Sequence, residues 1–446
     1  ASVAGPGFIN IRLTNEELIS EMELVLSAKC QGLRGKKLMV EYAHPNTHKE
    51  MHIGHMRTLI TGEAVARLLE EAGATVFRAN YQGDIGPHVA KSIWGTLELL
   101  KEKNKTLDDC ESMSLAEKAH LLGDGYIRGN RDYEANKVTI DAVNESLYHH
   151  KPEYEATYLK TRQWSLDYYD TLYARYDTKF DQFFFESQMA KPGKKIVEGN
   201  IGKVFEKSDG ALIFDGEKYG LHKRVFVTAD GNPTYEGKEL ALSIAERQAF
   251  EFDKKIHVVG NEQDGYFQVV FKAIELIDPW FKDREYHLSM GMVSLIGQKM
   301  SSRTGVIITV DGLLNEVNEL IKPLMKEANE DVLEMVTIGA VKYSVLSTHP
   351  TANAVFDIKQ SVALQGNSGP YLQYTYARTR SVLVRAKGQG LSAKDIAPST
   401  QLNTEELSIL RHIYKFPEVI EEAASRYSPN LLCNFIYELA QRYNTF

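Results

Sequence analysis

The sequence predicts an α/β protein in which a parallel-sheet domain, interrupted by a helical insertion, is followed by an all-α region. Two observations lead to this fold class. Near the N-terminus an apolar run, a stretch of helical periodicity and a second apolar run follow one another, and similar apolar runs return between residues 250 and 295. After about residue 345 the apolar spacing is helical throughout, with no strand pattern. Strands that alternate with helices favour a parallel sheet covered by helices.

The first elements form a strand, helix, strand unit. Residues 37–42 have the composition of a short buried strand. Residues 54–71 have helical periodicity that ends at Gly73, and residues 74–79 resemble a second strand. Parallel strands joined in this way take a right-handed crossover. We therefore expect a Rossmann-like sheet with helices on its faces.

Later segments extend the sheet and interrupt it. The apolar runs at 256–259 and 286–293 are expected to complete the sheet, and ligands of such folds lie at the carboxyl ends of the strands. Residues from about 95 to 195 are rich in Glu, Lys and Tyr with helical periodicity, which predicts a helical insertion. From 202 to 228, short apolar segments alternate with Gly and Asp, which indicates small antiparallel hairpins.

Length, composition and charge limit the function classes. A chain of 446 residues is too long for one ordinary core and suggests roughly two to four packed units. The hydrophobic fraction of 43% and charged fraction of 25% are typical of a globular protein in water. No apolar run approaches the ~20 residues that span a bilayer. The net charge of −8 does not favour nucleic-acid binding, so any RNA contact must use local basic patches.

The three cysteines and the start of the chain bear on the compartment. Cys30, Cys110 and Cys433 are scattered and odd in number, which argues against a disulfide framework and a thiolate zinc cluster. We therefore expect a reducing cytoplasm. The first residues lack a basic segment followed by a long apolar stretch, so a secretory signal is not expected. The chain does not begin with Met, which suggests a lost upstream segment.

The loop after the first predicted strand carries the first chemical motif, His52-Ile53-Gly54-His55, at a predicted helix start. Amides at a helix N-terminus attract anions, and imidazoles can donate hydrogen bonds to phosphoryl oxygens. Gly54 has no Cβ, so the backbone there can approach a flat ring such as adenine. Taken alone, the tetrapeptide could equally be a chance helix cap.

A second motif follows the last predicted strand. Residues 297–305 (Gly-Gln-Lys-Met-Ser-Ser-Arg-Thr-Gly) are polar and bounded by glycines. A mobile loop of this kind can close Lys299 over a triphosphate and neutralise charge on departing pyrophosphate. A solvated basic loop is the alternative. The order of the two motifs, each just past a strand, favours one nucleotidyl-transfer site.

Together the motifs resemble the two signatures of class I aminoacyl-tRNA synthetases, and further stretches resemble arginyl-tRNA synthetase in particular. These stretches are residues 41–46 with Lys49, residues 80–86, residues 291–293, residues 366–374 and Ala377-Arg378. The resemblance covers nearly the whole chain. It implies an arginine–tRNA ligase that uses ATP with Mg²⁺, L-arginine and tRNA(Arg), as a cytoplasmic monomer without a membrane segment or a protein-bound structural metal.

The resemblance also implies a domain organisation. The expected divisions are a remnant of an N-terminal tRNA-binding domain (1–35), the catalytic domain (36–310), a linker that contacts the tRNA stem (311–345), and a helical anticodon-binding domain that stops short of the usual length (346–446). The closely spaced Tyr371, Tyr374 and Arg378 suit stacking on anticodon bases and phosphate contact. Tyrosines at such spacing are also common in the core of a helix bundle, and we expect some of each.

One departure from the class signature is informative. The class usually carries a second lysine where this chain has Ser302. In the arginyl family that lysine is often missing, and a lysine just upstream of the first motif is thought to replace it. Lys49 fills that position, although lysines are mostly exposed surface residues in any protein.

Arginine recognition requires a carboxylate, because a guanidinium presents a planar fork of donors. Tyr235 and Glu239 lie four residues apart, so a helix beginning there would place both on one face. The family places a Tyr and an acidic residue, usually Asp, at these positions, so Glu239 makes the depth of the pocket uncertain. The alternative is that Glu239 is an exposed acid favoured near a helix start.

The family resemblance assigns the remaining site residues. The expected arginine-binding residues are Glu41, Asn46, Tyr235, Glu239 and Gln263. The expected ATP-binding residues are His52, Gly54, His55, Met292, Val293, Lys299 and Ser301, of which His52, His55 and Lys299, with Lys49, are expected to be catalytic. Asp84 could organise the substrate ammonium or Mg²⁺, or could equally cap a loop.

The residues also indicate the mechanism and its rivals. No Cys-His or Ser-His-Asp arrangement demands a covalent intermediate, and a carboxylate held in line can attack the ATP α-phosphate directly. The rivals are a class I synthetase for another amino acid, cysteine above all, a nucleotidyltransferase that makes a small cofactor, and a non-catalytic RNA-binding paralogue. The missing zinc ligands count against a cysteine enzyme, and the helical C-terminal block counts against a cofactor-making nucleotidyltransferase. The intact motifs count against a non-catalytic paralogue.

Overall fold

The computed structural model describes residues 1–446 except 12, 28–29, 297–307, 326–328 and 392–400. The strands are β1 (Ser2–Ala4), β2 (Phe8–Asn10), β3 (Lys37–Glu41), β4 (Thr75–Gln82), β5 (Gln182–Phe185), β6 (Glu206–Ser208), β7 (Ala211–Phe214), β8 (Arg224–Val227), β9 (Lys254–Gly260), β10 (Glu285–Met290), β11 (Val293–Leu295) and β12 (Ala354–Phe356).

The α-helices cover this framework. They are α1 (Asn15–Ser27), α2 (Ile53–Glu71), α3 (Pro87–Glu102), α4 (Leu115–Arg131), α5 (Tyr133–Tyr148), α6 (Pro152–Arg175), α7 (Glu186–Gly199), α8 (Tyr235–Ala249), α9 (Asp264–Ile277), α10 (Val310–Ile321), α11 (Glu330–Leu346), α12 (Ile358–Ser361), α13 (Gly369–Gly388), α14 (Thr404–Ile413), α15 (Phe416–Ser425) and α16 (Pro429–Thr445).

The central sheet has five parallel strands in the order β10-β9-β3-β4-β5. The predicted strand, helix, strand unit is confirmed as β3, α2 and β4. Of the two later apolar runs, residues 256–259 form the centre of β9. The run at 286–293 divides, because β10 ends at Met290 and Val293 begins β11, which pairs with β12 outside the central sheet. Chain order reverses between β3 and β9, which makes the gap at their carboxyl ends a natural ligand site.

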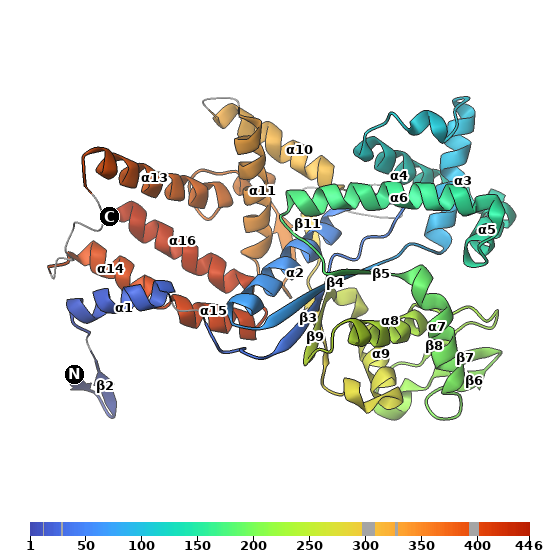
Figure 1. The fold of residues 1–446 in the computed structure, drawn as a ribbon, viewed down its shortest axis with the longest axis horizontal. Helices are drawn as coiled ribbons and strands as arrows, with labels where there is room; N and C mark the ends of the chain where they lie inside the picture. The colour runs from blue at the N-terminus through green and yellow to red at the C-terminus, as the bar shows by residue number, and fades with distance from the viewer. Residues whose placement is uncertain (12, 28–29, 297–307, 326–328, 392–400) are drawn as a thin grey trace.

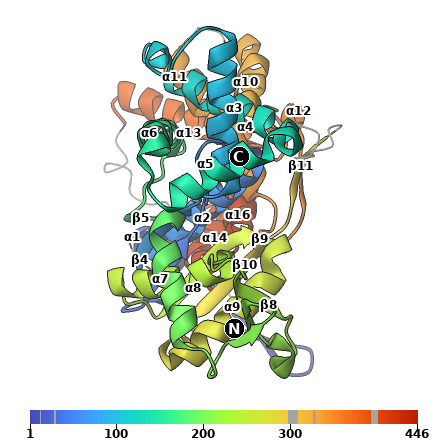
Figure 2. The same ribbon diagram turned by 90° about the vertical axis from the view of Figure 1, so that its right-hand side faces the viewer.

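The two faces of the sheet are covered by different helices, because successive side chains of a strand point to opposite faces. Val40 and Ile256 belong to a core with α2, α10 and α11. Met39 belongs to a core with α7, α8 and α9. In Figures 1 and 2 the sheet accordingly lies between α2 and the group α7–α9. Just past the end of β3, α2 approaches the chain closely: a Cβ on Gly62 would lie 2.3 Å from the Tyr42 ring.

The expected helical insertion is present but shorter than predicted. Helices α3 to α6 pack together beside the sheet, at the upper right of Figure 1. The expectation that the helical stretch continues to residue 195 was wrong, because residues 182–185 form β5, the edge strand beside β4. This strand has only four residues, three of them Phe, so its short apolar run was hidden within an aromatic-rich helical region. The predicted antiparallel strands between 202 and 228 are confirmed as β6, β7 and β8.

The C-terminal part of the chain is helical with one exception. Helices α13 to α16 form a bundle to which α1 adds through α14, at the left of Figure 1. The expectation of no strand after residue 345 was wrong for Ala354–Phe356, which pairs with β11. Three residues are too few to show an alternating pattern. The expected linker, 311–345, is formed largely by α10 and α11, which pack against α2 in the main core.

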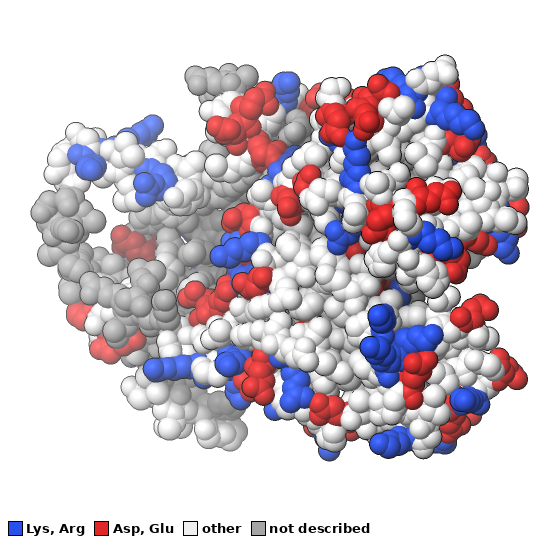
Figure 3. Space-filling view, turned by 45° about the vertical axis from the view of Figure 1, so that its right-hand side comes forward, with Lys and Arg blue, Asp and Glu red and all other residues white. Residues whose placement is uncertain are grey.

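Among the described residues, no helix is long and apolar enough to cross a membrane. On the face shown in Figure 3, basic side chains occur in small groups among acidic ones.

Candidate active site

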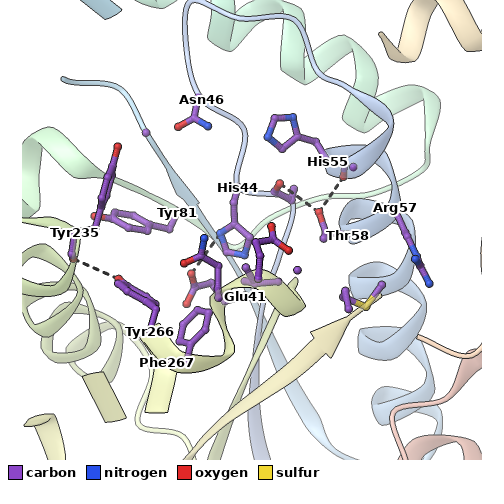
Figure 4. A pocket seen from close by; sticks show the side chains of 18 of the residues that line it. Glu41, His44, Asn46, His55, Arg57, Thr58, Tyr81, Tyr235, Tyr266 and Phe267 are labelled. Carbon is purple, nitrogen blue, oxygen red and sulfur yellow. Dashed lines mark hydrogen bonds and ion pairs between the residues drawn. The ribbon is translucent and has the colours of Figure 1, made fainter. Parts of the chain in front are cut away.

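A cavity of about 610 Å³ opens at the carboxyl ends of β3 and β9. It is lined by residues that follow β3, by the start of α2, by α8 and by the segment between β10 and β11. Figure 4 shows Tyr81, Tyr235 and Tyr266 on one side of Glu41, and His55, Thr58 and Arg57 on the other. The cavity therefore joins the two groups of residues expected for the amino acid and for ATP.

The first motif forms the start of α2. His52 is the N-cap, and its Nδ1 accepts the backbone N–H groups of Gly54 at 3.0 Å and His55 at 3.3 Å. The two imidazoles are stacked with their centroids 3.7 Å apart. A Cβ on Gly54 would lie 2.8 Å from His52 Cε1, so glycine at this position preserves the stack. The motif is thus a helix cap and a paired imidazole donor at once.

Both imidazoles are neutral near pH 7. Burial and then the charge of Lys49 lower the pKa of His52 to about 4. Burial and the neighbouring His52 hold the pKa of His55 well below its ordinary value. Because Nδ1 of each ring accepts a backbone N–H, the ring proton lies on Nε2. The pair therefore presents two neutral N–H donors, which can bind phosphoryl oxygens without carrying charge.

Lys49 lies beside this pair and forms no ion pair with any residue that the structure describes. Its Nζ lies 4.0 Å from the centroid of the Tyr126 ring, which α4 of the insertion supplies. Burial and then Lys91 lower the pKa of Lys49 to about 8. A partly desolvated ammonium over an aromatic ring is a cation available to an anionic ligand. Lys299 and Ser301 lie outside the described residues.

Met292 and Val293 border the same side of the cavity. Arg57 of α2 donates to the carbonyl oxygens of Gly291 and Met292, the second at 2.8 Å, and also to two carbonyls of the 350–352 segment. Arg57 is almost fully buried, and burial lowers its pKa to about 10, so it remains charged near neutrality. This guanidinium fixes the β10–β11 connection relative to the start of α2.

The loop after β3 is tightly bent. Ala43 and His44 have φ values of 78° and 51°, in a region that residues with side chains seldom adopt. Each such residue carries strain of about 1–2 kcal/mol, which is tolerated where surrounding contacts fix the backbone. Here the Tyr169 hydroxyl donates to the carbonyl oxygens of Asn46, at 2.6 Å, and Lys49, at 2.7 Å. The bend brings Asn46 to the cavity wall.

Glu41 and Glu239 approach each other in the wall of the cavity. Ligand atoms of Glu41, Glu239 and His257 all lie within 4.8 Å of one another. Glu41 ends β3, and Glu239 lies one turn into α8, which begins at Tyr235 as the spacing predicted. Lys255 Nζ lies 2.9 Å from Glu41 Oε2, so this cluster of acidic and imidazole side chains already contains a cation. A flat organic cation suits the remaining oxygens better than a metal ion does.

The two carboxyl groups differ in charge. Burial would raise the pKa of Glu41, but Lys255 and His257 hold it well below its ordinary value. Burial and the nearby Glu41 raise the pKa of Glu239 to about 7. Glu239 Oε2 accepts from the Tyr266 hydroxyl at 3.0 Å, whereas Oε1 is buried without a hydrogen-bond partner. A buried acceptor without a partner among the described residues can accept a hydrogen bond from a ligand donor.

The other residues expected around the amino acid also line the cavity. Tyr235 is largely exposed at the start of α8, and its carbonyl accepts from Tyr266. Gln263 ends a 3₁₀ turn, Asn261–Gln263, that follows β9. The structure thus brings together Glu41, Asn46, Tyr235, Glu239 and Gln263 in one cavity with His52, Gly54, His55, Met292 and Val293.

Two family models match the chain. Residues 19–358 match the model of tRNA synthetases class I (R), catalytic domain, and residues 372–446 match the DALR anticodon binding domain. Relatives include arginine–tRNA ligases of Flavobacterium psychrophilum and Treponema denticola, each 30% identical over 99% of this chain and 78% of the relative. The chain belongs to the class I arginyl-tRNA synthetase family.

Solved structures agree with this membership at the level of the fold. Thermus thermophilus arginyl-tRNA synthetase is similar with a TM-score of 0.81 and 24% identity, over 98% of this chain and 78% of that one. Mycobacterium tuberculosis methionyl-tRNA synthetase in complex with methionyl-adenylate is similar with a TM-score of 0.58 and 11% identity, over 92% and 83% of the two chains. The synthetase fold therefore extends over nearly the whole chain.

Asp84 has a structural role in this member of the family. Its carboxylate is fully buried and accepts from Ser187 N and Oγ, Arg162 Nε and the Tyr158 hydroxyl, at 2.7 to 3.3 Å. These donors come from α6 and α7. Of the alternatives left open by the sequence, the loop-fixing role fits this geometry, because both oxygens are already used.

The three residues expected to contact tRNA lie on α13, away from the cavity. Tyr371 packs against Tyr437 with centroids 5.7 Å apart, and its hydroxyl accepts from Asn444 at 3.0 Å. Arg378 donates to the same Asn444 at 3.0 Å. Tyr374 is about half exposed. Tyr371 and Arg378 therefore join α13 to α16, and only Tyr374 of the three presents a ring to solvent.

Several cavity residues were not recognised from the sequence. Arg57 follows the first motif by two residues, and Tyr266 follows Gln263 by three. Their closeness to predicted site residues could therefore have identified both from the sequence. Tyr81 lies inside a strand pattern, where its hydroxyl suggested nothing special. The same holds for His257, which contacts Glu41 without lining the cavity. Their roles depend on which strands are neighbours.

Proposed function

We propose that this cavity is where the chain, a class I arginyl-tRNA synthetase, activates L-arginine with ATP and passes the arginyl group to tRNA(Arg). The observation that carries the proposal is the buried pair Glu41 and Glu239, with Glu239 Oε1 lacking a hydrogen-bond partner among the described residues, in a cavity that the His52–His55 pair also lines. A guanidinium presents a planar fork of N–H donors, so arginine fits two carboxylates better than a ligand with a single ammonium group, such as lysine, does.

The amino-acid end is formed by Glu41, Glu239, Tyr235, Asn46 and Gln263. The two carboxylates accept from the guanidinium, and the Tyr235 ring covers its stem. Glu239 is one methylene longer than the family's usual Asp, and the Tyr266 hydroxyl at 3.0 Å supports its reach across the cavity. Asn46 and Gln263 hold the α-amino and carboxylate end of arginine.

The nucleotide end works by position and charge. His52 and His55 donate Nε2–H to phosphoryl oxygens, Lys49 supplies a cation, and Gly54, Met292 and Val293 bind adenine. The arginine carboxylate then attacks the ATP α-phosphate in line, pyrophosphate leaves, and the ribose hydroxyl at the tRNA end attacks the adenylate. Lys299 and Ser301 are proposed to act on the departing pyrophosphate.

Mg²⁺ is proposed to enter as part of the ATP substrate. Asp84, the carboxylate considered for a metal from the sequence, has both oxygens occupied by protein donors. The phosphates themselves are therefore the main ligands of the ion. We also propose that Tyr374 contacts the anticodon. The protein is further proposed to act in the cytoplasm as a monomer, and light scattering can test the oligomeric state.

Arginine-dependent exchange of ³²P between pyrophosphate and ATP, with tRNA(Arg) present, tests the activity. We expect exchange with L-arginine and none with lysine or cysteine. Glu239→Gln should raise the arginine KM by about 30-fold or more, because it removes a buried charged acceptor, and leave the ATP KM within about twofold. Equal exchange with cysteine would refute the proposal.

Glu236→Gln is the matched control for Glu239→Gln. Glu236 also borders the cavity on α8, but its Oε1 is paired with Arg224 NH1 at 3.0 Å. Its charge is therefore already neutralised, and the arginine KM should change by less than about threefold. A larger effect at Glu236 than at Glu239 would exchange their proposed roles.

A further inference from the structure

Lys255 is a cation in the interior of the sheet, close to the proposed arginine-binding carboxylates. It lies on β9, where it pairs in register with Met39 of β3, while His257 pairs with Glu41. Side-chain alternation sends Lys255 and His257 to the α8 face of the sheet, because Ile256 and Val258 occupy the α2 face. Lys255 is fully buried, and an unpaired ammonium at such a position would cost several kcal/mol.

Two carboxylates flank the ammonium. Glu41 Oε2 lies 2.9 Å from Lys255 Nζ, and Glu246 of α8 contacts the same Nζ from behind. Although burial alone would lower the pKa of Lys255, Glu246 and Glu41 hold it well above its ordinary value. Burial, which outweighs the effect of Lys255, raises the pKa of Glu246 well above its ordinary value. Lys255 therefore joins two carboxylates in the sheet interior, of which Glu41 lines the cavity.

The contacts also orient the Glu41 carboxylate. Oε2 is held from the sheet interior by Lys255 and by His257 Nδ1 at 3.2 Å, and His257 is in turn held by Glu285 at 2.7 Å. Oε1 instead lies 3.4 Å from His44 Nδ1, in the loop that lines the cavity. Oε2 is thus held by ion-pair contacts from the sheet interior, and Oε1 lies beside a residue that lines the cavity.

We propose that Lys255 is a positioning residue that keeps Glu41 ionised and its Oε2 anchored, so that the cavity presents a negative acceptor to a guanidinium. Glu239 shares the cavity, has no ion pair with the residues described by the structure, and changes its protonation with the ligand. The groups that face Glu41 are Lys255 and His257 of β9, Glu239 and Glu246 of α8, His44, and Glu285 of β10. This inference rests on the proposed function.

The test is the dissociation constant of L-arginine, measured by isothermal titration calorimetry on the full chain between pH 5.5 and 8.5. Lys255→Met should weaken arginine binding about 10- to 100-fold at pH 7, because Glu41 then takes up a proton. Below pH 7 the dissociation constant should rise as the pH falls. The slope of its logarithm against pH should correspond to the release of about one proton per arginine in the wild type and about two in Lys255→Met. ATP binding should be unchanged.

Two controls separate positioning from stability. Arg78→Met breaks another buried ion pair, between Arg78 and Glu63 at 3.1 Å on β4 and α2, away from the cavity. It should lower the melting temperature as Lys255→Met does but leave arginine affinity within about twofold. Glu246→Gln removes the other carboxylate beside Lys255 and should likewise leave both affinity and pH slope nearly unchanged. Equal arginine affinities for Lys255→Met and Arg78→Met would overturn the inference.

A variant that retains Lys255 keeps the inference testable if Lys255→Met does not fold. Glu239→Gln removes the titration of Glu239, so its arginine affinity, although weaker, should be independent of pH down to about pH 5.5 if Lys255 keeps Glu41 ionised. A remaining one-proton slope would show that Glu41 titrates in this range and would overturn the inference. Absence of arginine binding in the wild type would instead refute the proposed function.

Discussion

The local pattern alone does not distinguish Glu239 from an exposed Glu near a helix start, and only the family resemblance places it in the arginine pocket. In the structure it is buried beside Glu41, and burial with that neighbouring charge raises its pKa to about 7. Below this pH the empty cavity holds a proton on Glu239. A guanidinium favours the ionised carboxylate, so arginine binding must lower the pKa of Glu239 and release that proton.

Proton release on binding can be measured directly. At pH 7 we expect about half a proton to leave per arginine bound, rising towards one at pH 6 and falling towards zero at pH 8.5. Calorimetric titrations in phosphate and Tris buffers, whose ionisation enthalpies differ, give the number. Glu239→Gln should abolish the release. Release that persists in that variant would assign the proton to another group, with His257 the nearest titratable base.

At the scale of elements, α2 connects the proposed nucleotide end of the cavity with the C-terminal part of the chain. Its first residues form the imidazole pair, and Arg57, one turn later, binds carbonyls that follow β10 and carbonyls of residues 350 and 352. Four acceptors from two segments converge on one buried guanidinium. The position of Met292 and Val293 therefore depends on α2 as well as on their own strand.

Arg57→Met tests this connection. Loss of the guanidinium frees the β10–β11 segment, so we expect the ATP KM to rise about tenfold while the arginine KM changes less than threefold. Steady-state exchange kinetics measure both. Arg175→Met is the control, because Arg175 also joins distant helices, through Glu334 at 2.8 Å and Asp311 at 3.2 Å, but does not line the cavity. A similar rise in the ATP KM for Arg175→Met would contradict the assignment.

Over the whole molecule, the cavity and the C-terminal helices lie in separate parts of the chain. Helices α13 to α16 lie on the side of α2 opposite α7–α9 in Figure 1. Tyr371 is fixed to α16, whereas Tyr374 is about half exposed on the same helix. Two tyrosines three residues apart thus have different expected roles.

Variants of these two tyrosines should separate RNA contact from helix packing. Tyr374→Ala should raise the KM for tRNA(Arg) about tenfold through lost stacking, with the melting temperature and the arginine KM unchanged. Tyr371→Ala should lower the free energy of unfolding of the helical bundle by about 2–3 kcal/mol. Aminoacylation kinetics and thermal melting measure the two effects. An unchanged tRNA KM in Tyr374→Ala would remove this residue from the proposed interface.

The sequence by itself determined the strand, helix, strand unit, the helix that starts at Tyr235 and the family. Each depends on local information: apolar periodicity for β3, α2 and β4, and a fixed spacing of chemical groups for the His52–His55 motif. β5 and β12 escaped prediction, because strands of four and three residues are too short for periodicity and are formed by pairing with distant strands.

Only the tertiary structure decided the chemistry of individual side chains. The sequence left Asp84 open between a ligand-binding and a loop-fixing role, and the convergence of α6 and α7 on its carboxylate favours the second. Lys255 gave no signal in a strand pattern, yet register with β3 brings it to 2.9 Å from Glu41. Charge, burial and hydrogen-bond partners depend on neighbours distant in sequence, so the protonation of Glu41 and Glu239 is a property of the folded sheet.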